Sequence, residues 1–259
     1  MRLSLLLLLL NVFQIFSQED HSMLVEYEFV TSLNGNSSIR DASLMTLDNY
    51  KSQYVVYGKK SQDSEFKQSE NDDMKYTKTF EISDGQNAYM LTDLRKKTIE
   101  YNSKIGKKKY LIIDSIPYFN WILESDKKHI GNYICNKATL NFRGRSYIAW
   151  YSSDIPISHG PWKFYGLPGL IIEISDTKNN YRWRVKKITY PYIVENEINF
   201  DSFELNEISI KDYIILLDKN SERTKQILMS RMPSGTEIVD GEIEIKRESI
   251  ELEYEWETE

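Results

Sequence analysis

The sequence contains one cysteine, Cys135, so an internal disulfide is excluded. The residues around Cys135 alternate between apolar and polar, and we therefore expect a buried thiol rather than a reactive one. Histidine is also scarce, and His21, His129 and His159 are not spaced as metal ligands. Glycine-rich phosphate loops and dinucleotide-binding fingerprints are absent. We therefore expect neither a metal site nor a cofactor.

Long apolar runs are absent after the first residues, and a membrane-spanning helix needs about 20 apolar residues. The chain begins with Met1-Arg2, continues with a leucine-rich stretch and turns polar directly after Ser17. This order is typical of a secretory signal peptide, with an uncleaved N-terminal anchor as the alternative. We expect residues 1–17 to be removed and residues 18–259 to form a single β-rich globular domain.

The same leader predicts where the protein works. A cleaved signal peptide implies export to the periplasm or to the outer membrane. No cysteine lies directly after the apolar stretch, where a lipid would be attached, so we do not expect a lipoprotein. Membrane association is expected to be peripheral at most.

Net positive charge is also lacking, since the formal net charge of the chain is −6. Residues 233–259 carry ten acidic and two basic side chains, a net charge of about −8. This balance excludes nucleic acid as an expected partner. Within the acidic region, residues 242–245 and 250–256 alternate between apolar and acidic side chains, which predicts strands with one acidic face.

What the sequence does contain is a series of short strand patterns. Residues 24–30 place Val25, Tyr27 and Phe29 on one face. The turns between successive patterns are too short for helical crossovers, so the sheet should be mainly antiparallel. The other expected strands are 50–57, 77–82, 88–91, 98–105, 110–113, 130–142, 146–151, 170–174 and 181–190.

The clearest of these patterns is a hairpin in the middle of the chain. Arg143-Gly144 stands where the hairpin turn is expected, and a polar bend is expected before it at 125–128. The alternation predicts that Ile134, Ala138, Leu140 and Phe142 share one face.

Helix is expected only near the C-terminus. Residues 209–212 have the capping-box order, with a serine at the cap and an acid three residues later. Tyr213, Ile214, Leu216 and Leu217 supply an apolar stripe, and a second helix is expected at 221–232. The expected fold class is therefore α+β, a mostly antiparallel curved sheet with one or two C-terminal helices.

One segment resembles a known family. Residues 166–171 read Gly-Leu-Pro-Gly-Leu-Ile, and they follow Ala-Trp-Tyr at 149–151, Asp-Ile-Pro at 154–156 and Gly-Pro-Trp at 160–162. This combination resembles the GLPGLI family. The resemblance implies an exported envelope protein of Gram-negative bacteria, from a family without an assigned activity. By analogy, the sheet is expected to form an incomplete barrel resembling that of periplasmic lipoprotein carriers.

The motif can also be interpreted physically. Proline fixes φ at the second position of a turn, and glycine supplies the positive φ that a type II turn needs at the third position. We expect Gly169 to take that position, in a rigid corner with Lys163 on the surface. The turn residues are Gly160, Pro161, Gly166, Pro168 and Gly169. If the corner is instead the rim of a binding cleft, its binding residues would be Trp150, Asp154, His159, Trp162, Phe164 and Leu167.

A basic face is expected on the strand at 181–190. Arg182, Arg184 and Lys186 alternate with Tyr181, Trp183 and Val185. We expect the basic residues to lie on a solvated outer face. The alternative is a stripe that binds anionic lipid headgroups or the acidic C-terminal strand of the same chain.

The leading hypothesis is a non-enzymatic envelope protein that binds an apolar ligand or a protein partner. The alternative is a hydrolase that uses Asp154 and His159 with a serine of the same loop. The Gly-x-Ser-x-Gly nucleophile elbow is missing, which weighs against that alternative.

Overall fold

The structure of the chain is a computed structural model that describes residues 22–58, 87–195, 197–231, 247 and 249–257. The expected signal peptide and the strands expected at 77–82 and 242–245 lie outside the described residues.

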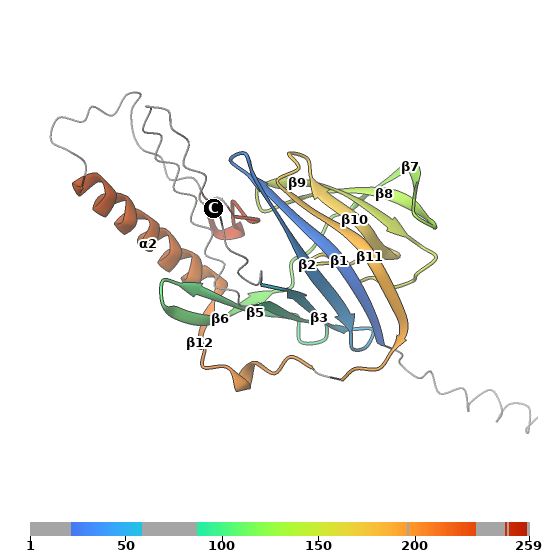
Figure 1. The fold of residues 1–259 in the computed structure, drawn as a ribbon, viewed down its shortest axis with the longest axis horizontal. Coiled ribbons are helices and arrows are strands. Elements are labelled where there is room, and N and C mark those ends of the chain that lie inside the picture. The colour runs from blue at the N-terminus through green and yellow to red at the C-terminus, as the bar shows by residue number, and fades with distance from the viewer. Residues whose placement is uncertain (1–21, 59–86, 196, 232–246, 248, 258–259) are drawn as a thin grey trace, which may run out of the picture.

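Strands dominate the described residues (Figure 1). They form one sheet in the order β12-β6-β5-β4-β3-β2-β1-β11-β10-β9-β8-β7. The strands are β1 (Ser22–Leu33), β2 (Asn36–Thr46), β3 (Lys51–Val56), β4 (Ala88–Asp93), β5 (Thr98–Ile105), β6 (Lys108–Ser115), β7 (Ile122–Ile130), β8 (Tyr133–Phe142), β9 (Arg145–Ser152), β10 (Leu170–Asp176), β11 (Tyr181–Tyr192) and β12 (Asn206–Ser209). The helices are α2 (Ile210–Ser230) and the 3-10 turns η1 (Phe200–Ser202) and η2 (Glu255–Glu257).

The pairing confirms a mostly antiparallel α+β fold. Every pair of neighbouring strands is antiparallel except β12 with β6, which is parallel. The two halves of the sheet meet where β1 pairs with β11, a contact between strands that are far apart in the sequence.

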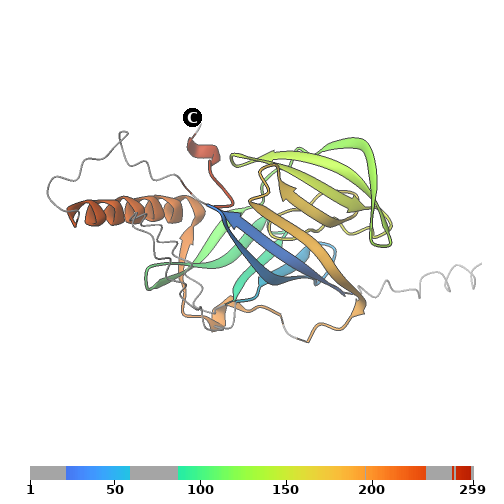
Figure 2. The same ribbon diagram turned by 45° about the horizontal axis from the view of Figure 1, so that its top comes forward.

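The sheet is strongly curved, and Figure 2 shows it folding back on itself. Asp114 in β6 and Arg143, directly after β8, lie only 2.8 Å apart. In a flat sheet, β6 and β8 would be nine strand spacings apart, or about 43 Å, because neighbouring strands are spaced by about 4.8 Å. The sheet therefore forms an incomplete barrel, as expected.

The core lies on the inner, concave face. Val25, Tyr27 and Phe29 are all buried there, as their alternation predicts. Trp183 of β11 donates a hydrogen bond from its indole N–H to the hydroxyl of Tyr54 in β3, at 2.8 Å. This bond crosses two intervening strands, so it exists only because the sheet curls.

Three of the observed strands differ from expectation. The sequence pattern did not reveal β2 or β12, and β7 runs through the expected bend at 125–128. The bend is replaced by an irregularity in the β7–β8 register between Leu123 and Lys127, which accommodates the polar residues without ending the strand.

The hairpin turn at Arg143-Gly144 is confirmed, and both residues have positive φ. Cys135 is fully buried, as expected. Ile134 differs from Ala138 in burial, because its side chain is 50% exposed whereas Ala138 is buried. The reason is that pairing with β9 begins only at Asn136, so Ile134 lies beyond the end of that strand.

Helix α2 is one continuous helix where two were expected. The capping box is confirmed, since the Ser209 hydroxyl accepts the Asp212 backbone N–H at 3.1 Å and donates to the Asp212 carboxylate at 2.7 Å. Tyr213 and Ile214 pack on Ile112 of β6. The expected apolar stripe was wrong in one position, because Leu216 points away from this contact and is partly exposed.

The strand expected at 250–256 is also wrong. Residues 249–257, which we call the C-terminal segment, have no strand partner and end in η2. Glu251 and Tyr254 are its buried side chains. These two residues are three positions apart, whereas a strand would bury every second residue. The difference arises because side-chain contacts, rather than hydrogen bonds to a neighbouring strand, hold the segment in place.

Within the described ranges, no helix is long and apolar enough to cross a membrane.

Candidate functional site

The segment with the family resemblance forms the loop between β9 and β10, residues 153–169, which we call the β9–β10 loop. Its middle is a short hairpin in which the Gly166 N–H donates to the Ser158 carbonyl at 2.7 Å and the Gly160 N–H donates to the Phe164 carbonyl at 2.8 Å. Trp162 lies at the tip with a positive φ of 55°. Two backbone hydrogen bonds thus close the hairpin, and its rigidity stays a prediction.

The tip of this hairpin points into the core. Trp162, Phe164 and Leu167 are all buried. The Phe164 ring meets the Tyr147 ring edge-on at 4.9 Å, and the Trp162 ring stacks parallel to the Trp183 ring at 6.3 Å. These three apolar residues, predicted as candidates for binding, fill the inside of the curved sheet. A binding role for them stays a prediction.

The turn before β10 differs in type from the one expected. Gly169 has a positive φ of 154°, as predicted, but its N–H donates to the Leu167 carbonyl at 2.8 Å. This is a three-residue turn around Pro168 rather than a type II turn. The Leu170 N–H donates to the Ile155 carbonyl, which fixes the start of β10.

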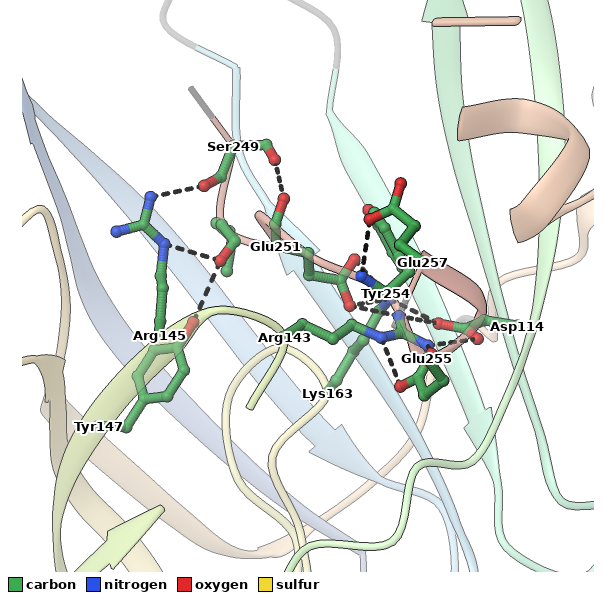
Figure 3. Close-up of polar contacts among 11 residues, drawn as sticks. Asp114, Arg143, Arg145, Tyr147, Lys163, Ser249, Glu251, Tyr254, Glu255 and Glu257 are labelled. Carbon is green, nitrogen blue, oxygen red and sulfur yellow. Dashed lines mark hydrogen bonds and ion pairs between the residues drawn. The ribbon is translucent and has the colours of Figure 1, made fainter. Parts of the chain in front are cut away.

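Lys163 lies between the two core aromatics, and its expected place on the surface was wrong. Its side chain is only 1% exposed. The ammonium group donates to Asp114 at 2.7 Å and to both oxygens of Glu251 at 2.8 and 2.9 Å (Figure 3). The two carboxylates come from β6 and from the C-terminal segment, far away in the sequence. No local pattern could have revealed this site.

Arg143 completes this group of buried charges. Its guanidinium donates to Asp114 at 2.8 Å, to Glu251 at 2.5 Å and to Glu255 at 3.0 Å. Burial alone would raise the pKa of Asp114, but Lys163 and Arg143 outweigh that effect and hold the pKa below its usual value. Asp114 is therefore ionised at neutral pH. We call Asp114, Arg143, Lys163 and Glu251 the charge cluster.

Arg145 ties the C-terminal segment to the same end of the sheet. Its guanidinium donates to the backbone carbonyls of Ser249 and Ile250 at 2.7 and 2.8 Å (Figure 3). The Leu252 N–H donates to the Arg143 carbonyl at 2.9 Å. The charged groups in this region are thus paired with one another. We interpret the charge cluster as a structural clamp that closes the incomplete barrel.

The polar candidates of the β9–β10 loop are not brought together. His159 is buried, with Nδ1 3.2 Å from the Ser52 hydroxyl and Nε2 3.3 Å from the Asn49 carbonyl oxygen. Burial lowers its pKa, so the ring is neutral at pH 7. Asp154 is exposed and accepts a hydrogen bond from Ser152 at 3.4 Å. Among the described residues, no hydrogen bond joins Asp154 to His159, and the hydrolase alternative gains no support.

Trp150 lies on the outer face of the sheet, apart from the other candidates. The ammonium of Lys128 lies 4.3 Å from the centre of its ring and also donates to Glu173 at 2.7 Å. Glu173 lies on β10, and Arg184 of the next strand, β11, also pairs with it, at 2.9 Å. Trp150 is therefore surrounded by charged side chains.

The basic residues of β11 lie on the outer face, as expected. Arg182, Arg184 and Lys186 are exposed, and Lys186 pairs with Asp41 of β2. In the described part of the chain, no ion pair joins the acidic C-terminal segment to these basic residues of β11. The carboxylates of the segment pair instead with Arg143 and Lys163 of the charge cluster and with Arg247, which donates to Glu257 at 2.6 Å. Binding of anionic lipid by this face stays a prediction.

A pocket of about 660 Å³ lies elsewhere, on the outer face of β4, β5 and β6. Leu91, Leu111 and Ile113 line it from the strands. Ile198 and Phe200 line it from the segment that crosses this face before β12. The Ile198 N–H donates to the Gln53 side chain at 2.8 Å, which holds the crossing segment in place. We call this the outer pocket.

The outer pocket was missed from the sequence. Its strands were expected, but the segment at 197–201 has no periodic pattern that would place it over them. Its remaining lining residues are polar: Glu100, Glu197, Asn199, Asp201 and Glu207. In the described part of the chain, no group of three or more histidine, cysteine or acidic side chains could hold a metal ion.

Comparison with known proteins adds information on family and fold. A family model described as a protein of unknown function (Porph_ging) matches residues 142–173, which include β9, the β9–β10 loop and the start of β10. No curated protein matches the chain. The family match covers the segment with the GLPGLI resemblance, and the name of that family stays a prediction.

Among solved structures, the chain is similar to PNGF-II in two crystal forms. The form in space group C2 gives a TM-score of 0.50 at 12% identity, covering 77% of this chain and 33% of that chain. The P21 form gives 0.49 at 11% identity. This chain thus spans about a third of the length of PNGF-II. The similarity to the C2 form indicates a shared fold over the aligned part.

Two further solved structures show weaker similarity to the chain. A LolA superfamily protein from Nitrosomonas europaea gives a TM-score of 0.32 at 8% identity, covering 71% of this chain and 93% of that chain. An outer membrane lipoprotein-sorting protein domain from Vibrio parahaemolyticus also gives 0.32 at 8% identity, covering 74% and 96%. Both TM-scores are too low to carry an argument about function.

Proposed function

We propose that this is an exported envelope protein that binds an apolar ligand in the outer pocket without catalysing a reaction. The observation that carries the proposal is the lining of that pocket, where Leu91, Leu111 and Ile113 are half-buried in the strands and Ile198 and Phe200 face them. Ligand sites are typically concave and combine apolar side chains with polar groups at fixed positions. Half of the described residues that line this pocket are apolar and half are polar.

The position of the pocket supports binding rather than packing. The core is on the opposite face of the same strands, where Met90 and Ile99 are buried. Leu91, by contrast, is only half-buried, although it neighbours Met90. An apolar ligand would remove this remaining apolar surface from water, which is favourable by roughly 25 cal/mol per Å². Of the two partners expected from the sequence, the pocket favours an apolar ligand over a protein.

Export remains part of this proposal. It rests on the leader at 1–17, whose residues lie outside the described part of the chain. Periplasm and outer membrane stay the two proposed destinations.

The pocket can be tested by filling it. Replacing Leu91 with tryptophan is expected to weaken binding of the neutral fluorescent probe N-phenyl-1-naphthylamine at least tenfold, because the larger side chain occupies the apolar floor. Leu216→Trp on α2 is the matched control, since Leu216 is partly exposed and does not line the pocket. Fluorescence titration measures both. Equal binding by the two variants would show that the probe binds elsewhere.

A further inference from the structure

We propose that the outer pocket selects apolar ligands that carry a positively charged head group. This inference rests on the proposed function, and it adds the charge of the ligand. Quaternary ammonium amphiphiles and apolar chains that end in a primary amine belong to this class.

The first observation is a carboxylate within the apolar lining. Glu100 is the third residue of β5 and lies directly opposite Leu91 on β4 and Ile113 on β6. It is half-buried between these two side chains, and no cation in the described ranges pairs with it. A carboxylate flanked by apolar groups and lacking a counter-ion favours a ligand that brings both an apolar body and a positive charge.

The second observation is the charge of the rim. Glu197, Asp201 and Glu207 are exposed around the opening, and none of the described residues that line the pocket is a lysine or arginine. Glu197 pairs with Lys51 at 3.4 Å, in a solvent-exposed contact that contributes little energy. No cation of the described ranges pairs with Asp201 or Glu207. A cationic head group would therefore meet the carboxylates of Glu100, Asp201 and Glu207, with which no cation of the described ranges pairs.

The same charges discriminate against other ligands. An anionic head group at the rim would face several carboxylates, with Lys51 paired to one of them, and like charges at an interface are costly. Neutral apolar molecules would gain only the burial of their apolar surface. For ligands that share the same apolar tail, we therefore expect the highest affinity for a cationic head group, a lower affinity for a neutral one and the lowest for an anionic one. This order follows from charge complementarity alone.

Displacement of N-phenyl-1-naphthylamine tests the order. The competitors are dodecyltrimethylammonium, dodecyl maltoside and dodecyl sulfate, which share a twelve-carbon chain and are used below their micelle concentrations. We expect the cationic competitor to displace the probe at a concentration at least tenfold lower than the anionic one. The difference should shrink as salt is added, because exposed charges are screened.

Variants assign the effect to this pocket. Glu100→Gln is expected to weaken dodecyltrimethylammonium about three- to tenfold more than it weakens the neutral probe. Glu222→Gln on α2 is the control and should change neither. Equal displacement by all three head groups, with probe binding intact, would overturn the charge inference and leave the proposed function standing. Absence of probe binding in the unaltered protein would overturn the proposed function itself.

Discussion

Replacing Lys163 with methionine is expected to lower the free energy of unfolding by about 3–5 kcal/mol, because it leaves buried carboxylates without their partner. Lys163 contacts Asp114 and Glu251, both of which are buried. Arg143 would remain beside them, so one positive charge would face two negative charges. Methionine keeps most of the volume, which isolates the loss of charge from the loss of packing. Denaturant unfolding measures the change.

Lys186→Met is the matched control for this prediction. Its ammonium also lies 2.7 Å from a carboxylate, that of Asp41, but the two side chains are 52% and 67% exposed. Exposed pairs typically contribute less than about 1 kcal/mol. We therefore expect a small effect there. If the two variants were equally stable, Lys163 could not be buried in the charge cluster.

Gly169→Ala should be the second severe change, at about 3 kcal/mol or more. A Cβ at this position would lie 2.2 Å from the Ser152 carbonyl oxygen and 2.9 Å from the Cα of Ser153, both backbone atoms that cannot rotate away. Overpacking of this kind costs about 1–3 kcal/mol. The positive φ adds about 1–2 kcal/mol for a residue with a Cβ.

Gly131→Ala separates these two contributions. Gly131 also has a positive φ, 57°, but no atom lies within 4 Å of the position that a Cβ would take. Only the backbone cost of about 1 kcal/mol is expected there. Thermal or denaturant unfolding of both variants gives the comparison. A Gly169 variant that is no less stable than the Gly131 variant would refute the close approach of the β9–β10 loop to Ser152.

Much of the sheet could be predicted from the sequence, because strand faces follow a local alternation. The burial of Val25, Tyr27 and Phe29 is an example. The pattern failed where a strand has little apolar content, as in the first half of β2, or where neighbouring strands end, as at Ile134. Local alternation carries no information on where a partner strand ends.

The site depended on contacts between distant residues, which a single sequence does not reveal. Lys163 was expected on the surface because lysine usually is, and its carboxylate partners lie 49 and 88 residues away. The outer pocket arises because the segment at 197–201 crosses β4, β5 and β6, which end between about 80 and 105 residues earlier in the sequence. Turn chemistry, by contrast, is local, and the positive φ of Gly169 was predicted correctly.

We propose that the β9–β10 loop is a structural element and that the ligand binds on the outer face of the sheet. Hydrogen exchange of the unaltered protein, with and without saturating N-phenyl-1-naphthylamine, distinguishes the two locations. We expect the probe to slow exchange in residues 88–93, 110–113 and 197–201 and to leave residues 158–169 unchanged. Protection confined to residues 158–169 would contradict this proposal and place binding at the loop with the family resemblance.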